Sequence, residues 1–252
     1  MVELLRSPAL SALTGVAHGF TGRRGGVSEG PLASLNLARR PGERDAALVA
    51  NWSAAMSAAG LSGPIALMNQ VHGAEVLEVL EGSGPLAVAG DADALLTRAP
   101  GVALAVRVAD CVPVLLAAPS GAPRGAAIAA VHAGWRGTAA RIVEAAVDAV
   151  CEASGARPET LVAAIGPAIG PCCYEVSQEV ADAICAAGGR ALPGPRGRPH
   201  LDLREANAAQ LRGRGVTTID FVGPCTRCSP DHYSHRGDGP ATGRQVGLIA
   251  LR

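Results

Sequence analysis

The chain has 252 residues and a formal net charge of zero, because its 22 basic and 22 acidic side chains cancel. A chain of this length can bury a sizeable core as one domain over residues 1–252. There is no basic run, so binding to nucleic acid is not predicted. None of the basic residues is Lys, which excludes a Schiff-base or Walker-type lysine.

A membrane span is not predicted either. The longest apolar segment, residues 101–118, is interrupted by Arg107 and Asp110, which is typical of core strands rather than of a bilayer helix. The seven cysteines are odd in number, and the N-terminus lacks the pattern of a secretory leader. Both features favour reduced thiols and a cytoplasmic location.

Short apolar runs predict strands along most of the chain, and they lie near residues 65–69, 74–80, 102–108, 112–117, 125–131, 161–165, 217–222 and 246–250. Few helices separate those in the middle, so the sequence does not follow a strict βαβ alternation. We therefore expect an α+β domain with a mixed sheet. The segments 22–30 and 192–199, rich in Gly, Pro and Arg, are expected to be loops.

Helical periodicity predicts four helices, at residues 45–59, 138–152, 178–187 and 202–212. In the second, apolar side chains recur at helical spacing behind Thr138, a candidate N-cap. Ser177 is placed to cap the third helix. Asp202 and Glu205 give the fourth a start of the capping-box kind.

One cysteine and two histidines form the most informative set of side chains. Cys111, His72 and His132 each stand at or beside the end of a predicted strand, where a sheet can present side chains to one point. One thiolate and two imidazoles suit zinc with its fourth position open, as in catalytic sites. A buried free cysteine with two hydrogen-bonded histidines would explain the same residues, and the spacing alone does not decide between these interpretations.

Asp110 directly precedes Cys111 in the segment ADC. In a regular strand its carboxylate points away from a metal bound by Cys111, whereas a kink would bring it to the open metal position as a general base. A hydrogen bond from Asp110 to a loop backbone is the alternative. The residues leave both roles open.

The segment HAGWRG, which begins at His132, predicts a turn into a helix. Gly134 and Gly137 allow the backbone to bend closely around a ligand. Arg136, near the start of that helix, suits an anion such as phosphate. Trp135 is placed to stack on a planar ring, although filling the core is the commoner role of a lone Trp.

Three further segments carry candidate binding residues. Arg24 lies in a Gly-rich loop of the kind that can cradle phosphate, Tyr174 follows two Gly-Pro turns that suggest a pocket wall, and Arg244 lies in the C-terminal segment. The segment CTRC (225–228) is a C-x-x-C. No second C-x-x-C exists to complete a structural zinc site, so these thiols are expected to be inert.

Seven segments in chain order resemble the family called laccase-domain or multicopper polyphenol oxidoreductase proteins: RGGVS, NQVHGAEV, DADALLT, ADCVPVLL, VHAGWRGT, IGPAIGPCCYEV and YSHRGDGPATGRQ. Bacterial members of this family are also named purine nucleoside phosphorylase and peptidoglycan editing factor. The resemblance runs from about residue 18 to the C-terminus. It departs at Gly237, where the family pattern has a second basic residue after Arg236.

The resemblance implies a single-domain α/β sandwich with flanking helices, and a zinc site made by His72, Cys111 and His132. It also implies phosphorolysis of adenosine, inosine and 5′-methylthioadenosine to base and ribose 1-phosphate, and deamination of adenosine to inosine. We assign catalysis to Asp110, Cys111 and His132. The candidate substrate-binding residues are Arg24, Gln70, Trp135, Arg136, Tyr174 and Arg244.

The geometry of this chemistry is left open. The purine C6 and the ribose C1′ lie at opposite ends of a nucleoside, so one metal cannot serve both reactions in one pose.

A multicopper oxidase needs a blue copper and a histidine-rich trinuclear cluster, usually built from H-x-H pairs. With six histidines and no H-x-H, this chain cannot build them, although copper can occupy the Cys/His site and support weak polyphenol oxidation.

The same residues also serve a second interpretation, a thiol hydrolase in which Cys111 is the nucleophile and His132 its base, acting on an amide such as a cell-wall peptidoglycan precursor. A non-enzymatic metal- or nucleotide-binding protein is a third. The expected partners are a purine nucleoside and phosphate. The sequence leaves open whether the protein is a monomer or a weak dimer.

Overall fold

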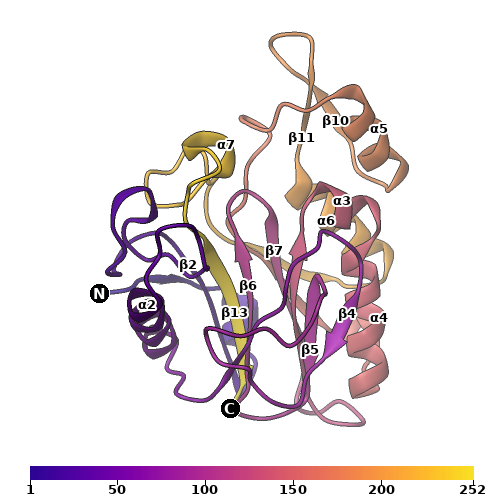
Figure 1. Cartoon of the computed structure of the whole chain (residues 1–252). Coiled ribbons are helices and arrows are strands. Elements are labelled where there is room, and N and C mark those ends of the chain that lie inside the picture. The colour runs from indigo at the N-terminus through magenta and orange to yellow at the C-terminus, as the bar shows by residue number, and fades with distance from the viewer.

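Two β-sheets lie face to face in the computed structural model, which describes residues 1–252, and helices cover both outer faces (Figure 1). One sheet has the strand order β1 (Leu4–Leu5), β2 (Val16–Thr21), β13 (Gln245–Leu251), β6 (Ala103–Val108) and β3 (Ile65–Ala66). The other has the order β12 (Thr218–Phe221), β9 (Val162–Ile165), β7 (Val112–Ala118), β8 (Ala127–Ala133), β5 (Ala94–Thr97) and β4 (Val76–Glu78). Both sheets are mixed. The predicted α+β sandwich class is confirmed.

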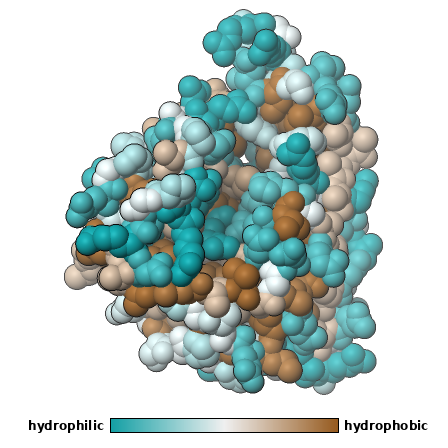
Figure 2. Space-filling model, in the orientation of Figure 1, coloured by the Kyte–Doolittle hydropathy of each residue, from teal (hydrophilic) through white to brown (hydrophobic).

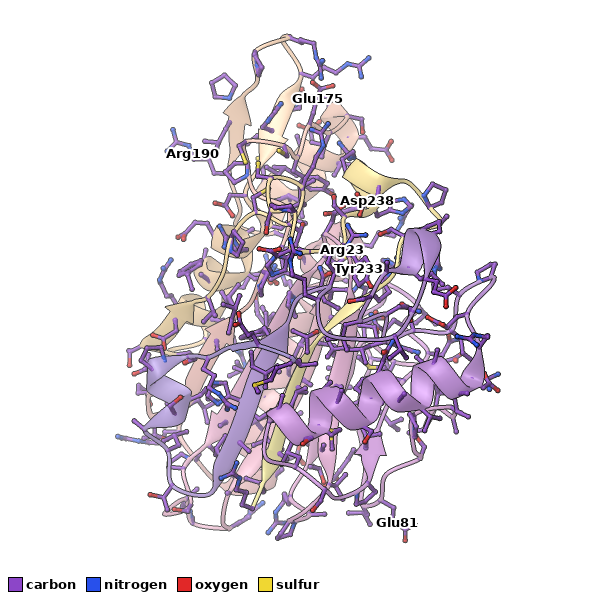
Figure 3. All side chains as sticks on the ribbon, turned by 90° about the vertical axis from the view of Figure 1, so that its left-hand side faces the viewer. Arg23, Glu81, Glu175, Arg190, Tyr233 and Asp238 are labelled. Carbon is purple, nitrogen blue, oxygen red and sulfur yellow. The ribbon has the colours of Figure 1, made fainter.

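The helices are arranged in two groups. Figure 3 shows α2 (Asp45–Ala58) lying across the outer face of the five-stranded sheet. The remaining long helices, α4 (Ile142–Ser154), α5 (Gln178–Ala186) and α6 (Leu203–Gly213), lie on the side of the six-stranded sheet. Short helical turns complete the chain: α1 (Pro8–Ser11), η1 (Gly30–Leu32), α3 (Trp135–Ala139), η2 (Pro158–Thr160) and α7 (His235–Asp238).

The apolar core has three layers, and strand β7 shows why. Val114 and Leu116 pack toward the core under α4 and α6, whereas Leu115 and Ala117 pack into the core between the sheets. A third core lies between α2 and the five-stranded sheet. Because the central strands are buried on both faces, their sequences are apolar throughout rather than alternating. This explains the continuous apolar runs in the sequence.

All eight predicted strands are present, two of them shorter than expected: β3 and β4 occupy only two and three residues of the runs near 65–69 and 74–80. Besides the hairpin described next, three strands were not predicted: β1, β2 and β5. The segment 192–199, predicted to be a loop, instead forms most of an antiparallel hairpin of β10 (Ala191–Pro193) and β11 (Pro199–Leu201).

The helix predicted over 138–152 is wrong at its start. Thr138 belongs to the preceding short helix α3, and α4 begins only after Arg141, which has a left-handed φ of 62°. That backbone turn ends one helix and starts the next. The Thr138 hydroxyl accepts a hydrogen bond from Asn207 Nδ2 at 3.0 Å, so this side chain joins α3 to α6 rather than capping α4. The predicted caps Ser177 and Asp202 do accept hydrogen bonds from the first turns of α5 and α6.

No helix of the structure is long and apolar enough to cross a lipid bilayer.

Candidate active site

Strand pairing brings Cys111 and His132 together. In the antiparallel pair of β7 and β8, Pro113 lies opposite His132 and Val112 opposite Ala133. Cys111 stands one residue before β7, so its side chain lies beside the end of β8. Because the two positions belong to neighbouring strands of a buried sheet, their separation has little freedom.

His72 reaches the same point from the loop between β3 and β4. Its φ is 63°, a left-handed conformation that is uncommon for a residue with a side chain. The His72 and His132 rings meet edge to face, with their centroids 4.9 Å apart. The ligand atoms of His72, Cys111 and His132 all lie within 4.8 Å of one another. The structure therefore brings together the three residues that the sequence singled out.

The donor set and its surroundings fit a metal ion. A Cβ on Gly134 would lie 3.1 Å from Cys111 Sγ and 3.2 Å from His72 Cδ2, so the backbone leaves room for these donors only because this residue is glycine. Two imidazoles and one thiolate are ligands that suit zinc, and copper also binds such sets.

Asp93 is a site residue that the sequence reasoning missed. Its carboxylate is fully buried, and Oδ1 lies 2.7 Å from His132 Nδ1. Oδ2 accepts hydrogen bonds from the backbone N–H groups of Gly73, at 2.6 Å, and Val71, at 3.2 Å. Asp93 thus orients the His132 ring and fastens the loop that carries His72. The segment DADALLT carries this residue at the start of β5, the neighbour of β8.

The ionisable groups of the centre shift one another's pKa values toward the charged forms. Burial alone would raise the pKa of the Cys111 thiol, but the neighbouring rings of His132 and His72 outweigh it and lower that pKa. Burial would lower the pKa of His132, but the Cys111 thiolate and Asp93 raise it. Burial likewise opposes ionisation of Asp93, and its hydrogen bonds from His132 and Gly73 keep its pKa below the usual range. The cysteine is therefore poised as a thiolate.

Both carboxylate oxygens of Asp110 accept hydrogen bonds from residues distant in the sequence, one in the loop after β12 and one in α7. Oδ1 accepts a hydrogen bond from Thr226 Oγ1 at 2.6 Å, and Oδ2 accepts one from the Arg236 backbone N–H at 2.7 Å. Asp110 has a φ of 87°, so the backbone is kinked here, as one of the two sequence interpretations required. The kink nevertheless directs the carboxylate to backbone and hydroxyl partners. It is buried and lines the cavity beside Cys111.

A cavity of about 880 Å³ opens above the three donors. In Figure 2 the corresponding face is hollowed near its centre, where hydrophilic side chains gather. The cavity collects nearly all the predicted site residues: Gln70, His72, Asp110, Cys111, His132, Trp135, Arg136, Tyr174 and Arg244. It also contains Arg236, which lies near Arg244 in the C-terminal segment, and three arginines that the sequence reasoning did not assign to the site: Arg39, Arg40 and Arg107.

Aromatic rings and guanidinium groups are paired along the cavity wall. The Arg136 guanidinium lies over the Trp135 ring, 4.3 Å from its centroid, and that of Arg236 lies 5.3 Å from the Tyr174 ring. Burial, together with the nearby Cys111 thiolate, raises the pKa of Tyr174 to about 12, so the phenol keeps its proton at neutral pH. Burial lowers the pKa of Arg244, whose Nη1 donates to the carbonyls of residues 242 and 243.

Gln70 lines the cavity, but its side-chain amide is bonded to backbone groups. Its Nε2 donates to the Arg107 carbonyl at 2.8 Å, and its Oε1 accepts from the Arg107 N–H at 2.9 Å. The amide thus joins the His72 loop to the end of β6. Both of its polar atoms are already used within the protein.

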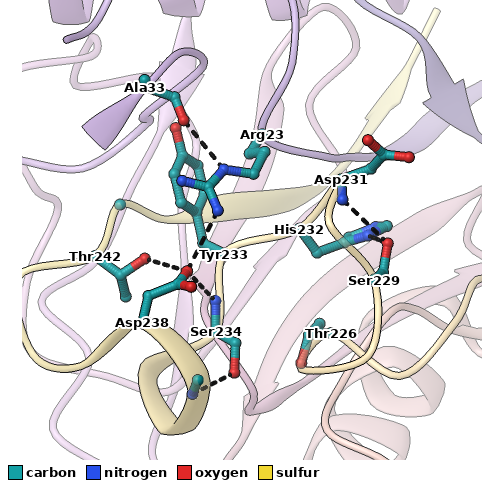
Figure 4. Close-up of polar contacts among 12 residues, drawn as sticks. Arg23, Ala33, Thr226, Ser229, Asp231, His232, Tyr233, Ser234, Asp238 and Thr242 are labelled. Atoms are coloured by element: carbon teal, nitrogen blue, oxygen red, sulfur yellow. Dashed lines mark hydrogen bonds and ion pairs between the residues drawn. The ribbon is translucent and has the colours of Figure 1, made fainter. Parts of the chain in front are cut away.

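Arg24 lies outside the cavity. Its side chain is exposed and pairs with Asp231, whereas its neighbour Arg23 turns inward over the Tyr233 ring. Figure 4 shows Arg23 hydrogen-bonded to the carbonyl of Ala33 and paired with Asp238. The Gly-rich loop 22–30 is therefore fastened to the C-terminal segment, and this leaves Arg24 on the outer surface.

The fold and the site together define a class of protein: a two-sheet α+β sandwich with a thiolate–imidazole centre beneath an arginine-lined cavity. The model of the family described as multi-copper polyphenol oxidoreductase laccase matches residues 17–252. The chain belongs to this family. The family name does not describe the site, because the structure gathers its metal-ligand side chains into only two groups, and only one of them contains histidine.

Relatives and solved structures agree over nearly the whole chain. A Deinococcus radiodurans protein named purine nucleoside phosphorylase is 44% identical over 253 residues, which cover 99% of this chain and 93% of that one. A Streptomyces griseus protein, purine nucleoside phosphorylase ORF3, is 42% identical over 95% of this chain and 96% of its own. The crystal structure of YlmD from Geobacillus stearothermophilus has a TM-score of 0.88 at 34% identity, covering 98% and 94%. These relatives support an enzyme of the purine nucleoside phosphorylase kind.

Proposed function

We propose that this protein is a zinc-dependent purine nucleoside phosphorylase that acts in the cavity above Cys111, on adenosine, inosine and 5′-methylthioadenosine. The observation that carries the proposal is the placement of the His72, Cys111 and His132 donors in one arginine- and aromatic-lined cavity of about 880 Å³. A cavity of this size lies within the range of small-molecule sites. The names of relatives such as the Deinococcus radiodurans protein support the substrate class.

The arginines of the cavity would bind phosphate. Six arginines but only two aspartates are among its lining residues, so the local charge favours an anion. Guanidinium groups bind phosphate oxygens through paired hydrogen bonds. Arg136 is exposed and held in place by Trp135, so it can turn its free edge to a phosphate. In phosphorolysis a phosphate oxygen bonds to C1′ of the ribose as the bond from C1′ to the base breaks, and the leaving base takes up a proton.

The aromatic residues would hold the purine. Tyr174 and Trp135 lie on the cavity wall and have planar faces on which a base can stack. Tyr174 keeps its hydroxyl proton at neutral pH and can donate it in a hydrogen bond to a ring nitrogen.

Zinc bound by His72, Cys111 and His132 would supply Lewis acidity in the cavity. The protein's own contribution is orientation: Asp93 holds the His132 ring so that its other nitrogen faces Cys111. We propose adenosine deamination as a second activity of this cavity, in which water adds oxygen at C6 and ammonia leaves. Asp110 is the carboxyl group nearest in sequence to the centre and the proposed proton carrier.

A thiol hydrolase is the second candidate, and one contact favours it. Cys111 Sγ lies within 4.8 Å of a His132 ring nitrogen, and His132 Nδ1 lies 2.7 Å from Asp93 Oδ1. A nucleophile, its base and a group that orients the base are the parts of a cysteine hydrolase. An amide of a peptidoglycan precursor would be its substrate.

An assay of adenosine with and without phosphate, followed by HPLC, separates these functions. The proposal expects adenine and ribose 1-phosphate only when phosphate is present, and inosine in its absence. The Cys111→Ala variant should lose both products. If adenosine is not converted with or without phosphate, and a cell-wall peptide amide is cleaved, the protein is a thiol hydrolase instead.

A further inference from the structure

Four cysteines outside the active centre converge from two distant segments. Cys172 and Cys173 lie in the loop after β9, and Cys225 and Cys228 lie in the loop after β12. Strands β9 and β12 are parallel neighbours, so both loops leave the same edge of the sheet. The sulfur of Cys228 lies 3.4 Å from that of Cys173 and 3.7 Å from that of Cys172, and all four sulfurs lie within 4.8 Å of one another.

The backbone of both loops is built around these sulfurs. Thr226, inside the C-x-x-C, donates its backbone N–H to the Ala168 carbonyl at 3.0 Å, which ties one loop to the other. The Gly170 N–H donates to Cys225 Sγ at 3.1 Å. A Cβ on Gly170 would lie 3.2 Å from Cys225 Cβ and 3.4 Å from Cys172 Sγ, so glycine is needed for this approach. An N–H group directed at sulfur stabilises a thiolate.

We propose that Cys172, Cys173, Cys225 and Cys228 form a closed, tetrahedral four-thiolate site for a zinc ion. Structural zinc binds four ligands at about 2.3 Å, and a tetrahedron of that size has sulfurs about 3.8 Å apart. The separations of 3.4 and 3.7 Å from Cys228 are close to this value, and the other sulfur pairs lie within 4.8 Å. In this proposal the adjacent pair Cys172–Cys173 supplies the two ligands that the single C-x-x-C lacks, in place of the inert thiols expected from the sequence.

The position of this site gives it a structural role beside the cavity. Tyr174, on the cavity wall, directly follows Cys173. Thr226, between Cys225 and Cys228, donates its hydroxyl to Asp110 Oδ1 at 2.6 Å. A zinc ion would therefore fasten together two loops that hold Tyr174 and Asp110. Its loss should impair substrate binding before it affects the Cys111 centre.

Metal content of purified protein, measured in variants, tests the site. The two clusters predict close to two zinc ions per chain in the wild type. Cys228→Ser should lose one of them, Cys111→Ser should lose the other, and the two changes together should lose both. Cys185→Ser is the matched control, because Cys185 is an exposed cysteine outside both clusters, and it should keep both ions. Two zinc ions per chain in Cys228→Ser would overturn the proposal. Two zinc ions per chain in Cys111→Ser would contradict only zinc binding at the active centre.

Alkylation of the wild-type protein keeps the test independent of how the variants fold. Cys172, Cys228 and Cys185 are all exposed, so accessibility alone predicts similar reaction rates with iodoacetamide. With zinc bound, Cys172 and Cys228 should react more slowly than Cys185, and a chelator should abolish the difference. Equal rates before chelation would refute the site, and so would recovery of Cys172 and Cys228 in one disulfide-linked peptide from freshly purified protein.

Discussion

Asp93 is the residue on which the geometry of His132 depends, and Asp93→Asn tests this. The amide keeps the shape of the side chain but removes the charge that lies 2.7 Å from His132 Nδ1. Loss of such a partner behind a metal-binding histidine typically weakens metal affinity by about 10- to 100-fold. Zinc affinity at the Cys111 centre, measured by competition with a chelating dye, should fall by this factor. Asp91→Asn is the control, because Asp91 is exposed and bonds only to Asn69. Equal affinities in the two variants would contradict the role of Asp93.

Arg136 and Arg24 form a matched pair for the phosphate site. Both are exposed, but only Arg136 lines the cavity. A hydrogen bond to a charged group contributes about 1.5–3 kcal/mol, so Arg136→Ala should raise the KM for phosphate by about ten- to a hundredfold. Arg24→Ala should leave that KM unchanged, and both variants should keep their zinc. A normal phosphate KM in Arg136→Ala would remove the anion role from this residue.

At the scale of single residues, sequence reasoning located donors but not their partners. His72, Cys111 and His132 could be singled out because their residue types point to one chemistry. The role of Asp93 depends on the pairing of β5 with β8, which no local pattern encodes. Arg24 was assigned to the site on the Gly-rich character of its loop, and the ion pair with Asp231 that holds it elsewhere joins residues far apart in the sequence.

Strand β2 was not predicted, and it contains a buried histidine that makes the stability of the fold depend on pH. Its sequence VAHGFT is broken by His18 and Gly19, which hides the strand pattern. His18 is buried, and its Nε2 accepts a hydrogen bond from the Ser7 N–H at 2.9 Å, so the neutral ring is the stable form. Burial, helped by Arg6, lowers the pKa of His18 from 6.5 to about 4.

The free energy of unfolding should therefore fall as the pH is lowered from about 6.5 to about 4. In this window the unfolded chain binds a proton at His18 that the folded chain does not, so stability increases with pH. Urea denaturation at several pH values should show a shallower dependence in His18→Gln than in the wild type. Coincident slopes would contradict the lowered pKa.

Helix ends were predictable where a side chain caps them and not where the backbone turns. Ser177 and Asp202 were identified because cap residues bond within their own helix. The division between α3 and α4 at Arg141 depends on a left-handed backbone conformation, for which Arg gives no local signal. The hairpin of β10 and β11 was missed because its sequence is dominated by Gly, Pro and Arg, which are typical of loops.

On the scale of the whole molecule, the α+β class followed from the order of apolar runs, but the face-to-face packing of two sheets did not. That packing places the loops of both sheets at one end of the molecule, where Figure 3 shows Glu175 and Asp238 far from Glu81. The active centre and the four-cysteine cluster both lie among these loops. The second cluster could not be predicted from spacing, since its two halves are more than fifty residues apart.

We propose that turnover of a purine nucleoside depends on the metal held by His72, Cys111 and His132. The most direct test removes metal with a chelator, restores zinc in steps, and follows phosphate-dependent release of adenine from adenosine at each step. Metal-free protein should release no adenine, and added zinc should restore release in the wild type but not in Cys111→Ala. Full turnover by metal-free protein, with a Cys111 that iodoacetamide alkylates rapidly, would contradict the proposal.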